Sequence, residues 1–275
     1  MLAAICSMFL MLNNTDTGLI KHSTETYELV WSDEFNKNGM VDTSVWYFEK
    51  GFMRNNELQW YQPENIWCEN GKLIIEGRRE TRPNPVYKEG SNNWRENRKD
   101  IHYTSGSINT RRTKTWQYGR FEVRAKIIAK PGLWPAIWTL GQKGEWPSNG
   151  EIDIMEYYKG DILANVATGT TERYRAKWFS TKKPVASFND PDWDNSFHTW
   201  RMDWDENFIR LYVDDLLLNE VPLSKLNNPD GSNPFQQPHY LLLNLAIGGD
   251  NGGNPSNTEF PSRYEVDYVR VYQKK

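Results

Sequence analysis

Three carboxylates occur within six residues, in the segment Glu151-Ile-Asp153-Ile-Met155-Glu156, whose other members are all apolar. Alternating carboxylate and β-branched residues predict a strand with one wet and one buried face, so Glu151 and Asp153 share a face. Glu156 joins them only if a β-bulge near Met155 resets the alternation. With that bulge, the three carboxylates line one surface, and two of them have the chemistry to cleave a glycosidic bond as acid and nucleophile.

The middle carboxylate, Asp153, is expected to support the other two. Its charge raises the proton affinity of its neighbours, so that one glutamate stays protonated as an acid while the other is ionised. A pair of carboxylates on a strand is also common on an ordinary solvated face, so the flanking residues decide between the two interpretations.

The flanking residues are aromatic. Trp134 and Trp138 precede the carboxylates in Leu-Trp-Pro-Ala-Ile-Trp, and Trp146 lies five residues before Glu151. Indole faces suit the apolar faces of sugar rings, and the Pro after Trp134 favours an exposed position for that ring. Trp138 could instead be core and Trp146 a loop anchor. The chain has 13 Trp, 14 Tyr and 11 Phe against 4 His, which leaves metal and histidine-based nucleophilic chemistry few residues to use.

Further motifs occur in a fixed order from roughly Tyr27 to Gln273. They are Trp31-Ser-Asp-Glu-Phe35, Asn55-Asn-Glu-Leu-Gln59, Tyr118-Gly-Arg120, Gly132-Leu-Trp-Pro-Ala-Ile-Trp138, Gly150-Glu-Ile-Asp-Ile-Met-Glu156, Phe197-His-Thr-Trp200, Met202-Asp-Trp204, Leu243-Asn-Leu-Ala-Ile-Gly-Gly249 and Val266-Asp-Tyr-Val-Arg-Val-Tyr272. This ordered set resembles the laminarinase-type branch of the family 16 glycoside hydrolases.

The resemblance implies a retaining endo-β-glucanase on a curved β-sandwich. Glu151 would be the nucleophile, Glu156 the general acid/base, and Asp153 the residue that tunes them. The additional Met155 is similar to the bulged motif of laminarinases and broad 1,3(4)-glucanases, in contrast to the regular motif of lichenases and xyloglucan transglycosylases.

The same resemblance implies other site residues. Asn56, Trp134, Trp138 and Asn244 match cleft positions that contact sugar, although Asn244 could simply satisfy backbone groups in an apolar strand. No cofactor is expected for catalysis. A structural calcium ion is implied on the convex side, where Asp267 would lend its side chain and Glu34 its backbone carbonyl. An ordinary surface Asp is the alternative for Asp267.

Two departures from the family pattern bear on specificity. Many laminarinases carry a His-Gly pair on the strand after the catalytic one, where this chain has smaller groups at Ala164 and Asn165. The stretch Thr171 to Asp194, with Tyr174, Trp178, Phe188 and Trp193, also fits the pattern poorly and could form an extra wall of the cleft.

Length and composition are typical of one secreted domain. Residues 1–26 are interpreted as a leader with a short linker, because Leu2 to Leu12 is an apolar run of signal-peptide length, and 27–275 as a single catalytic domain. Removal of the leader with Cys6 leaves Cys68 without an intrachain partner. A net charge of −3 and a pI near 5.9 argue against nucleic acid as a partner and favour a neutral glucan. We expect a monomer that is secreted, periplasmic or on the cell surface, without a membrane span.

The remaining patterns predict an all-β fold. Stretches such as 72–77, 120–127 and 264–272 alternate polar and apolar residues, and 209–218 indicates a hairpin at Asp214-Asp215. The charged region Arg82 to Asp100 is expected to be one long solvated loop. We therefore predict a curved two-sheet jelly-roll β-sandwich of the concanavalin type with a concave cleft.

Hydrolysis of mixed-linkage β-1,3/1,4-glucan or of the β-1,3-glucan laminarin is the function predicted first. A non-catalytic carbohydrate-binding jelly roll would keep the tryptophans but has no need for three aligned carboxylates. A hydrolase of the same fold that acts on a marine galactan, similar to agarases and carrageenases, is the second alternative. A calcium module is disfavoured, since such sites use loop oxygens and not isoleucines in a strand.

Overall fold

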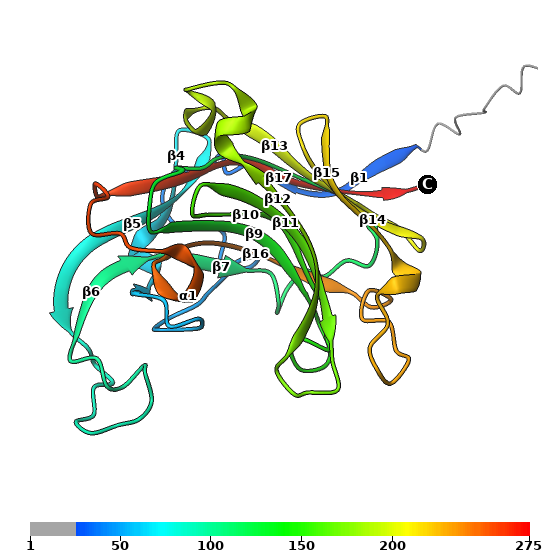
Figure 1. Ribbon diagram of the computed structural model, residues 1–275. Helices are drawn as coiled ribbons and strands as arrows, with labels where there is room; N and C mark the ends of the chain where they lie inside the picture. Colours follow the sequence, from blue (N-terminus) through cyan, green and yellow to red (C-terminus); the bar gives the residue numbers. More distant parts are fainter. Residues whose placement is uncertain (1–25) are drawn as a thin grey trace, which may run out of the picture.

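Two β-sheets pack face to face in the computed structural model, which describes residues 26–275 (Figure 1). The larger sheet consists of β1 (Tyr27–Asp33), β3 (Gln59–Tyr61), β4 (Ile66–Glu69), β5 (Lys72–Pro83), β6 (Asp100–Ser105), β8 (Gly119–Lys126), β13 (His198–Trp204), β14 (Phe208–Val213), β15 (Leu216–Pro222) and β17 (Ser262–Lys274). The smaller sheet consists of β2 (Tyr47–Phe48), β7 (Ser107–Asn109), β9 (Leu133–Gly141), β10 (Glu151–Tyr158), β11 (Asp161–Gly169), β12 (Ala176–Pro184) and β16 (His239–Ile247). The predicted jelly-roll β-sandwich is confirmed.

The smaller sheet carries the site, and its strands run in the order β12-β11-β10-β9-β16-β7-β2. Strands β9 to β12 curve together in Figure 1, and residues of all four strands line one cavity on the outer face of the sheet. Within the described residues, helical structure is limited to α1 (Gly249–Gly252) and to short 3₁₀ turns at Pro63–Asn65, Val185–Phe188, Trp193–Asn195 and Leu223–Lys225. The curved sheet therefore supplies both the floor and one wall of a cleft.

The core lies between the two sheets and follows the alternation in the sequence. In β13 every second residue is buried, and Trp200 and Trp204 lie fully inside with Phe121 of β8. The apolar residues of β10 point the same way and pack into this core. The core thus fixes which face of β10 is turned to the solvent.

The elements predicted from alternation are present as strands β5, β8 and β17, and Asp214-Asp215 forms the turn between β14 and β15. The long segment between β5 and β6 contains no strand or helix. In the part of the chain that is described, no helix is long and apolar enough to cross a membrane. The apolar run Leu2 to Leu12, with Cys6, lies outside the described residues, so the leader stays a prediction. Cys68 is a buried free thiol.

Candidate active site

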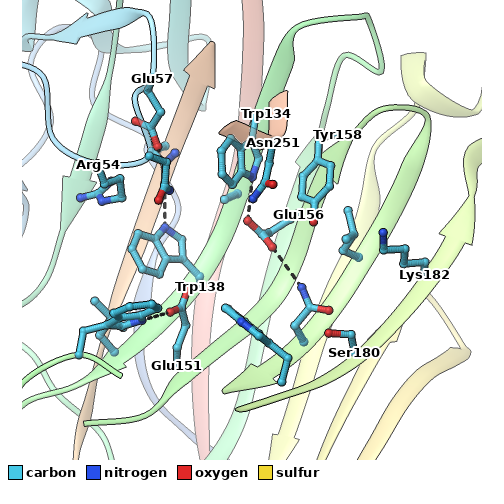
Figure 2. Close-up of a pocket in the computed structure, with 18 residues that line it drawn as sticks. Arg54, Glu57, Trp134, Trp138, Glu151, Glu156, Tyr158, Ser180, Lys182 and Asn251 are labelled. Atoms are coloured by element: carbon cyan, nitrogen blue, oxygen red, sulfur yellow. Dashed lines mark hydrogen bonds between the residues drawn. The ribbon is translucent and has the colours of Figure 1, made fainter. Parts of the chain in front are cut away.

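A bulge in β10 brings the three carboxylates to one face of the sheet. The pairing with β9 and with β11 shifts register after Asp153, at the position that the sequence predicts. Ile154 and Met155 are both fully buried in the core, so two successive side chains point inward and the next residue, Glu156, points outward. Glu151 and Glu156 therefore line the same cavity, of about 620 Å³, on the outer face (Figure 2).

Asp153 lies between the two glutamates and is hydrogen-bonded to both. Its position is fixed from the next strand, where Asn165 of β11 donates to Asp153 Oδ2 and to Glu156 Oε2, each at 3.2 Å. Asn165 is thus part of the site, although the sequence analysis treated it only as the loss of a ring. Because the carboxyl group of Asp153 contacts both glutamates, it limits the distance between the carboxyl groups of Glu151 and Glu156.

Each glutamate also accepts a hydrogen bond from an indole. Trp134 Nε1 donates to Glu156 Oε1 at 2.7 Å, and Trp146 Nε1 donates to Glu151 Oε2. These bonds hold the carboxyl groups in fixed orientations toward the cavity, as Figure 2 shows for Glu156. Trp146, which the sequence left as a possible loop anchor, is therefore in contact with the carboxylates.

Burial raises the pKa of all three carboxyl groups. The pKa of Glu156 is raised to about 7, first by desolvation and then by the charge of Glu151. Desolvation also raises the pKa of Glu151, while hydrogen bonds with Trp146 and Asp153 oppose this shift. Asp153 was expected to raise the pKa of its neighbours through its charge, but its hydrogen bonds lower the pKa of both glutamates. The pKa of Asp153 is raised well above its usual value by desolvation and by the charges of both neighbours. A glutamic acid that keeps its proton near neutral pH is suited to protonate a leaving group.

Two of the expected sugar-contacting residues form the floor beside the carboxylates. Trp138 of β9 and Asn244 of β16 both line the cavity, and Trp138 Nε1 donates to Asn244 Oδ1 at 2.7 Å. Asn244 in turn donates to the Tyr61 hydroxyl at 3.1 Å. Its amide is therefore engaged with side chains, not with strand backbone.

Two other expectations need correction. Trp134 was expected to be exposed, but it lies within strand β9 and only 6% of it is accessible, because its ring packs against the sheet beside Glu156. Asn56 does not line the cavity. Its amide donates to Asp250 at 3.0 Å, and the neighbouring Asn55 faces the cavity in its place.

A buried charged cluster that was not predicted from the sequence lies on one side of the cavity. Arg54 lines the cavity, forms an ion pair with Glu49 and lies 5.2 Å above the ring of Trp138. Glu57 is buried beside it, accepts a hydrogen bond from Gln59 at 2.6 Å, and has a pKa raised by desolvation, which the charge of Arg54 opposes. An arginine that lies close in sequence to two glutamates is a signal that could have been used, since buried charges need partners.

The loop between β5 and β6 holds this cluster in place. Arg95 donates to the carbonyls of Phe52 and Met53, and Arg98 donates to those of Asn56 and Glu57. From its mixed charges this loop was expected to be solvated. That interpretation was wrong for its arginines, because four carbonyls of the segment that carries Arg54 accept hydrogen bonds from them.

We expect Arg98→Ala to raise KM for polysaccharide by roughly fivefold, because the lost hydrogen bonds to the segment that carries Arg54 cost on the order of 1 kcal/mol. The value of kcat should change less, because these hydrogen bonds lie away from the carboxylates. Steady-state kinetics would measure this. Lys88→Ala is the control, because Lys88 belongs to the same loop and its side chain is 68% exposed. A drop in kcat at unchanged KM would contradict the bracing role.

The expected extra wall is present as strand β12, paired with β11 along its whole length. Trp178 lines the cavity and is 45% exposed, whereas Tyr174 lies in the preceding loop and donates to Glu145. Phe188 and Trp193 stack on each other beyond the strand and contribute to the core, not to the cleft.

The residues proposed for calcium lie together, because β1 pairs with β17 and Asp33 is opposite Val269. The carboxylate of Asp267 is paired with Arg124, and that of Glu34 accepts two hydrogen bonds from Arg270. Within residues 26–275, no three His, Cys, Asp or Glu side chains form a group that could hold a metal ion. The side chains here supply at most one carboxylate to an ion that takes about six to eight oxygens, so backbone carbonyls such as that of Glu34 would have to supply most of the other ligands.

Comparison with known proteins agrees with this geometry. The model of the family "Glycosyl hydrolases family 16" matches residues 54–270. A beta-glucanase of Rhodothermus marinus is 36% identical over 90% of this chain and 85% of its own length. The glucan endo-1,3-beta-glucosidase A1 of Niallia circulans is 33% identical over 90% of this chain, which spans 38% of that longer protein.

Solved structures show the same relationship. The laminarinase of Rhodothermus marinus superposes with a TM-score of 0.74 at 36% identity, over 92% of this chain and 99% of its own. A structure from work on endo-acting O-glycanases, which members of the human gut microbiota express to initiate mucin breakdown, superposes with a TM-score of 0.82 at 37% identity, over 90% and 91% of the two chains. With this match in sequence and fold, the chain belongs to the glycosyl hydrolases of family 16.

Proposed function

We propose that this protein is an endo-acting β-glucanase that hydrolyses internal bonds of β-1,3-glucan or mixed-linkage β-1,3/1,4-glucan with retention of configuration. The observation that carries the proposal is the bulge in β10, which turns Glu151 and Glu156 to one cavity with the buried Asp153 between them on the same face of the sheet. The names of the relatives, a beta-glucanase and a glucan endo-1,3-beta-glucosidase, support the substrate class. A carbohydrate-binding module would not need three buried carboxyl groups with raised pKa.

In the proposed mechanism, Glu151 attacks the anomeric carbon while Glu156 donates its proton to the departing oxygen. The raised pKa of Glu156 keeps that proton available at neutral pH. After the leaving chain has gone, Glu156 acts as base toward water, which releases the sugar from Glu151. The bridge through Asp153 favours the short carboxyl separation of retaining enzymes, about 5 to 5.5 Å, over the longer one of inverting enzymes.

The indole floor and the open hollow support an endo mode of action. The cavity is lined by Trp134, Trp138, Trp146 and Trp178, which are spread from β9 to β12 on both sides of the carboxylates. A chain that continues in both directions fits such a surface. A polymer of this kind is met outside the cell, which supports the predicted secretion.

We expect kcat/KM to be higher on barley mixed-linkage glucan than on laminarin, and we expect cellulose not to be cleaved. Ala164 and Asn165 stand where many laminarinases have a His-Gly pair, and β12, which pairs with β11, is proposed to form a wall that favours locally straight chains. One lost ring contact is worth on the order of 1 to 3 kcal/mol, which suffices to reverse a preference. Reducing-sugar release from the three polymers under identical conditions would measure it. Laminarin preferred by tenfold or more would contradict the expectation.

A second candidate substrate class is O-glycan chains. The specific observation in its favour is the TM-score of 0.82 to the structure from the O-glycanase work, compared with 0.74 to the laminarinase. Mucin O-glycans added to the same panel would distinguish the two. Cleavage of mucin chains without cleavage of any β-glucan would replace the first proposal by the second.

Structural calcium remains a proposal that rests on the resemblance, with Asp267 and the Glu34 carbonyl as the protein ligands. If the ion is structural, a chelator should lower the melting temperature of the calcium-loaded protein, and added calcium should restore it, because an ion bound only by the folded state stabilises it. Differential scanning calorimetry would measure the shift. An unchanged melting temperature would remove the proposal.

A further inference from the structure

Strand β12 turns three alternate side chains to the cavity, namely Trp178, Ser180 and Lys182. The pairing places them in register with the carboxylates across β11. Lys182 is opposite Leu163, which is opposite Glu156, and Ser180 is opposite Asn165, which is opposite Asp153. Two strand spacings separate the β10 and β12 backbones, or about 10 Å. That span leaves room for a sugar unit over β11.

The space over β11 lies on the side of the carboxylates that is opposite the Arg54 cluster, as Figure 2 shows for Ser180 and Lys182. The β11 side chains between them, including Leu163 and Asn165, are short relative to an aromatic ring. Over β11 the short side chains therefore leave the cavity deeper, and the exposed indole of Trp178 lies at the edge of this part of the cavity.

The charge of Lys182 sets it apart from the other cations near the cleft. Arg54 is paired with Glu49, and Arg173 with Glu145. Lys177 and Lys183, on the same strand, lie 4.9 and 5.0 Å from the rings of Phe179 and Phe188. For the side chain of Lys182 no ion pair, hydrogen bond or ring contact is found among residues 26–275, although it lines a cavity with two glutamates.

We propose that Trp178, Ser180 and Lys182 form a subsite for a sugar unit that carries a negative charge, as a sulfate ester or a carboxylate. The inference rests on the proposed glycan hydrolysis and names a substrate feature that neutral glucans lack. A neutral sugar exchanges the water around an ammonium group for hydroxyls at little gain, whereas an anion forms a charge-assisted hydrogen bond with it. The ammonium also offsets the repulsion between such an anion and the nearby carboxylates.

The test uses one β-1,3-glucan in three forms: neutral, lightly sulfated, and oxidised at C6 to the carboxylate. The measured quantity is the ratio of kcat/KM on each anionic form to kcat/KM on the neutral form, for the wild type, Lys182→Gln and Lys183→Gln. Lys183→Gln removes the same charge from the same strand, on the side away from the cavity. Calorimetric titration of the inactive Glu151→Gln protein, with and without Lys182→Gln, gives a readout that needs no turnover.

Lys182→Gln should lower the anionic-to-neutral ratio by about tenfold at low salt, and Lys183→Gln should leave it at the wild-type value. The sulfated and carboxylated arms show which anion the subsite prefers. The subsite would be overturned if Lys182→Gln left the anionic-to-neutral ratio of kcat/KM unchanged, or if Lys183→Gln lowered that ratio equally. Cleavage of the neutral glucan in the same experiment would show that the proposed hydrolysis still holds. Binding of the glucans without cleavage by the wild type would overturn the proposed hydrolysis instead.

Discussion

Glu151→Ala should lower turnover of every glycoside by roughly 10⁴-fold or more, because loss of a nucleophile removes the whole covalent route. With an activated aryl β-glycoside, azide should restore activity and yield a glycosyl azide of inverted configuration, since the small anion attacks from the face that Glu151 occupied. Product analysis by NMR would measure the outcome.

Glu145→Ala is the control for Glu151→Ala. Glu145 lies in the loop before β10, is exposed, and pairs with Arg173 and Tyr174, so its loss should leave turnover near the wild-type rate. Rescue of Glu151→Ala by azide with retained configuration would assign Glu151 to the acid/base role and would contradict the proposed mechanism.

Glu156→Ala should largely spare the first step on substrates with activated leaving groups and should abolish activity on polysaccharide, because only the poor leaving group needs the proton. In the wild type, kcat/KM on polysaccharide should fall as the pH rises through about 7, where Glu156 loses that proton. Stopped-flow release of the aryl group and a pH profile would measure both effects. Equal losses on activated and natural substrates would contradict the role.

Glu156 should also affect the pH dependence of stability. Its pKa is raised in the folded protein, so its stabilising contribution is complete below the ordinary value near 4.5 and is lost as the pH rises through about 7. A shift of this size corresponds to roughly 3 kcal/mol. Glu156→Gln should therefore flatten the decline of the melting temperature between pH 5 and 8. An identical decline in both proteins would contradict the raised pKa.

The strand, the bulge and the shared face of the carboxylates could be predicted because they depend on local alternation. Glu151, Asp153 and Glu156 cannot all lie on one face of the sheet unless one residue between them is extra, and Met155 is the residue available. The strands of the core were predictable for the same reason, since burial on one face imposes a period of two.

The residues whose locations were predicted incorrectly are positioned by contacts between segments that are distant in the sequence. The exposure expected for Trp134 came from its Pro neighbour, but the ring packs against Tyr158 and donates to Glu156, which buries it. The position of Asn56 is set by Asp250, which lies 194 residues further along the chain. Arg98 contacts the segment at Asn56 across 42 residues, so its bracing role leaves no periodic signal in the sequence.

The configuration of the first product released from a neutral β-glucan tests the central claim most directly. Proton NMR during the first minutes of hydrolysis resolves the α and β anomers before mutarotation mixes them. If Glu151 and Glu156 act by double displacement, the new reducing end should appear first as the β-anomer, with the α-anomer growing in slowly. Appearance of the α-anomer first would mean direct attack by water and would contradict the mechanism proposed for this site.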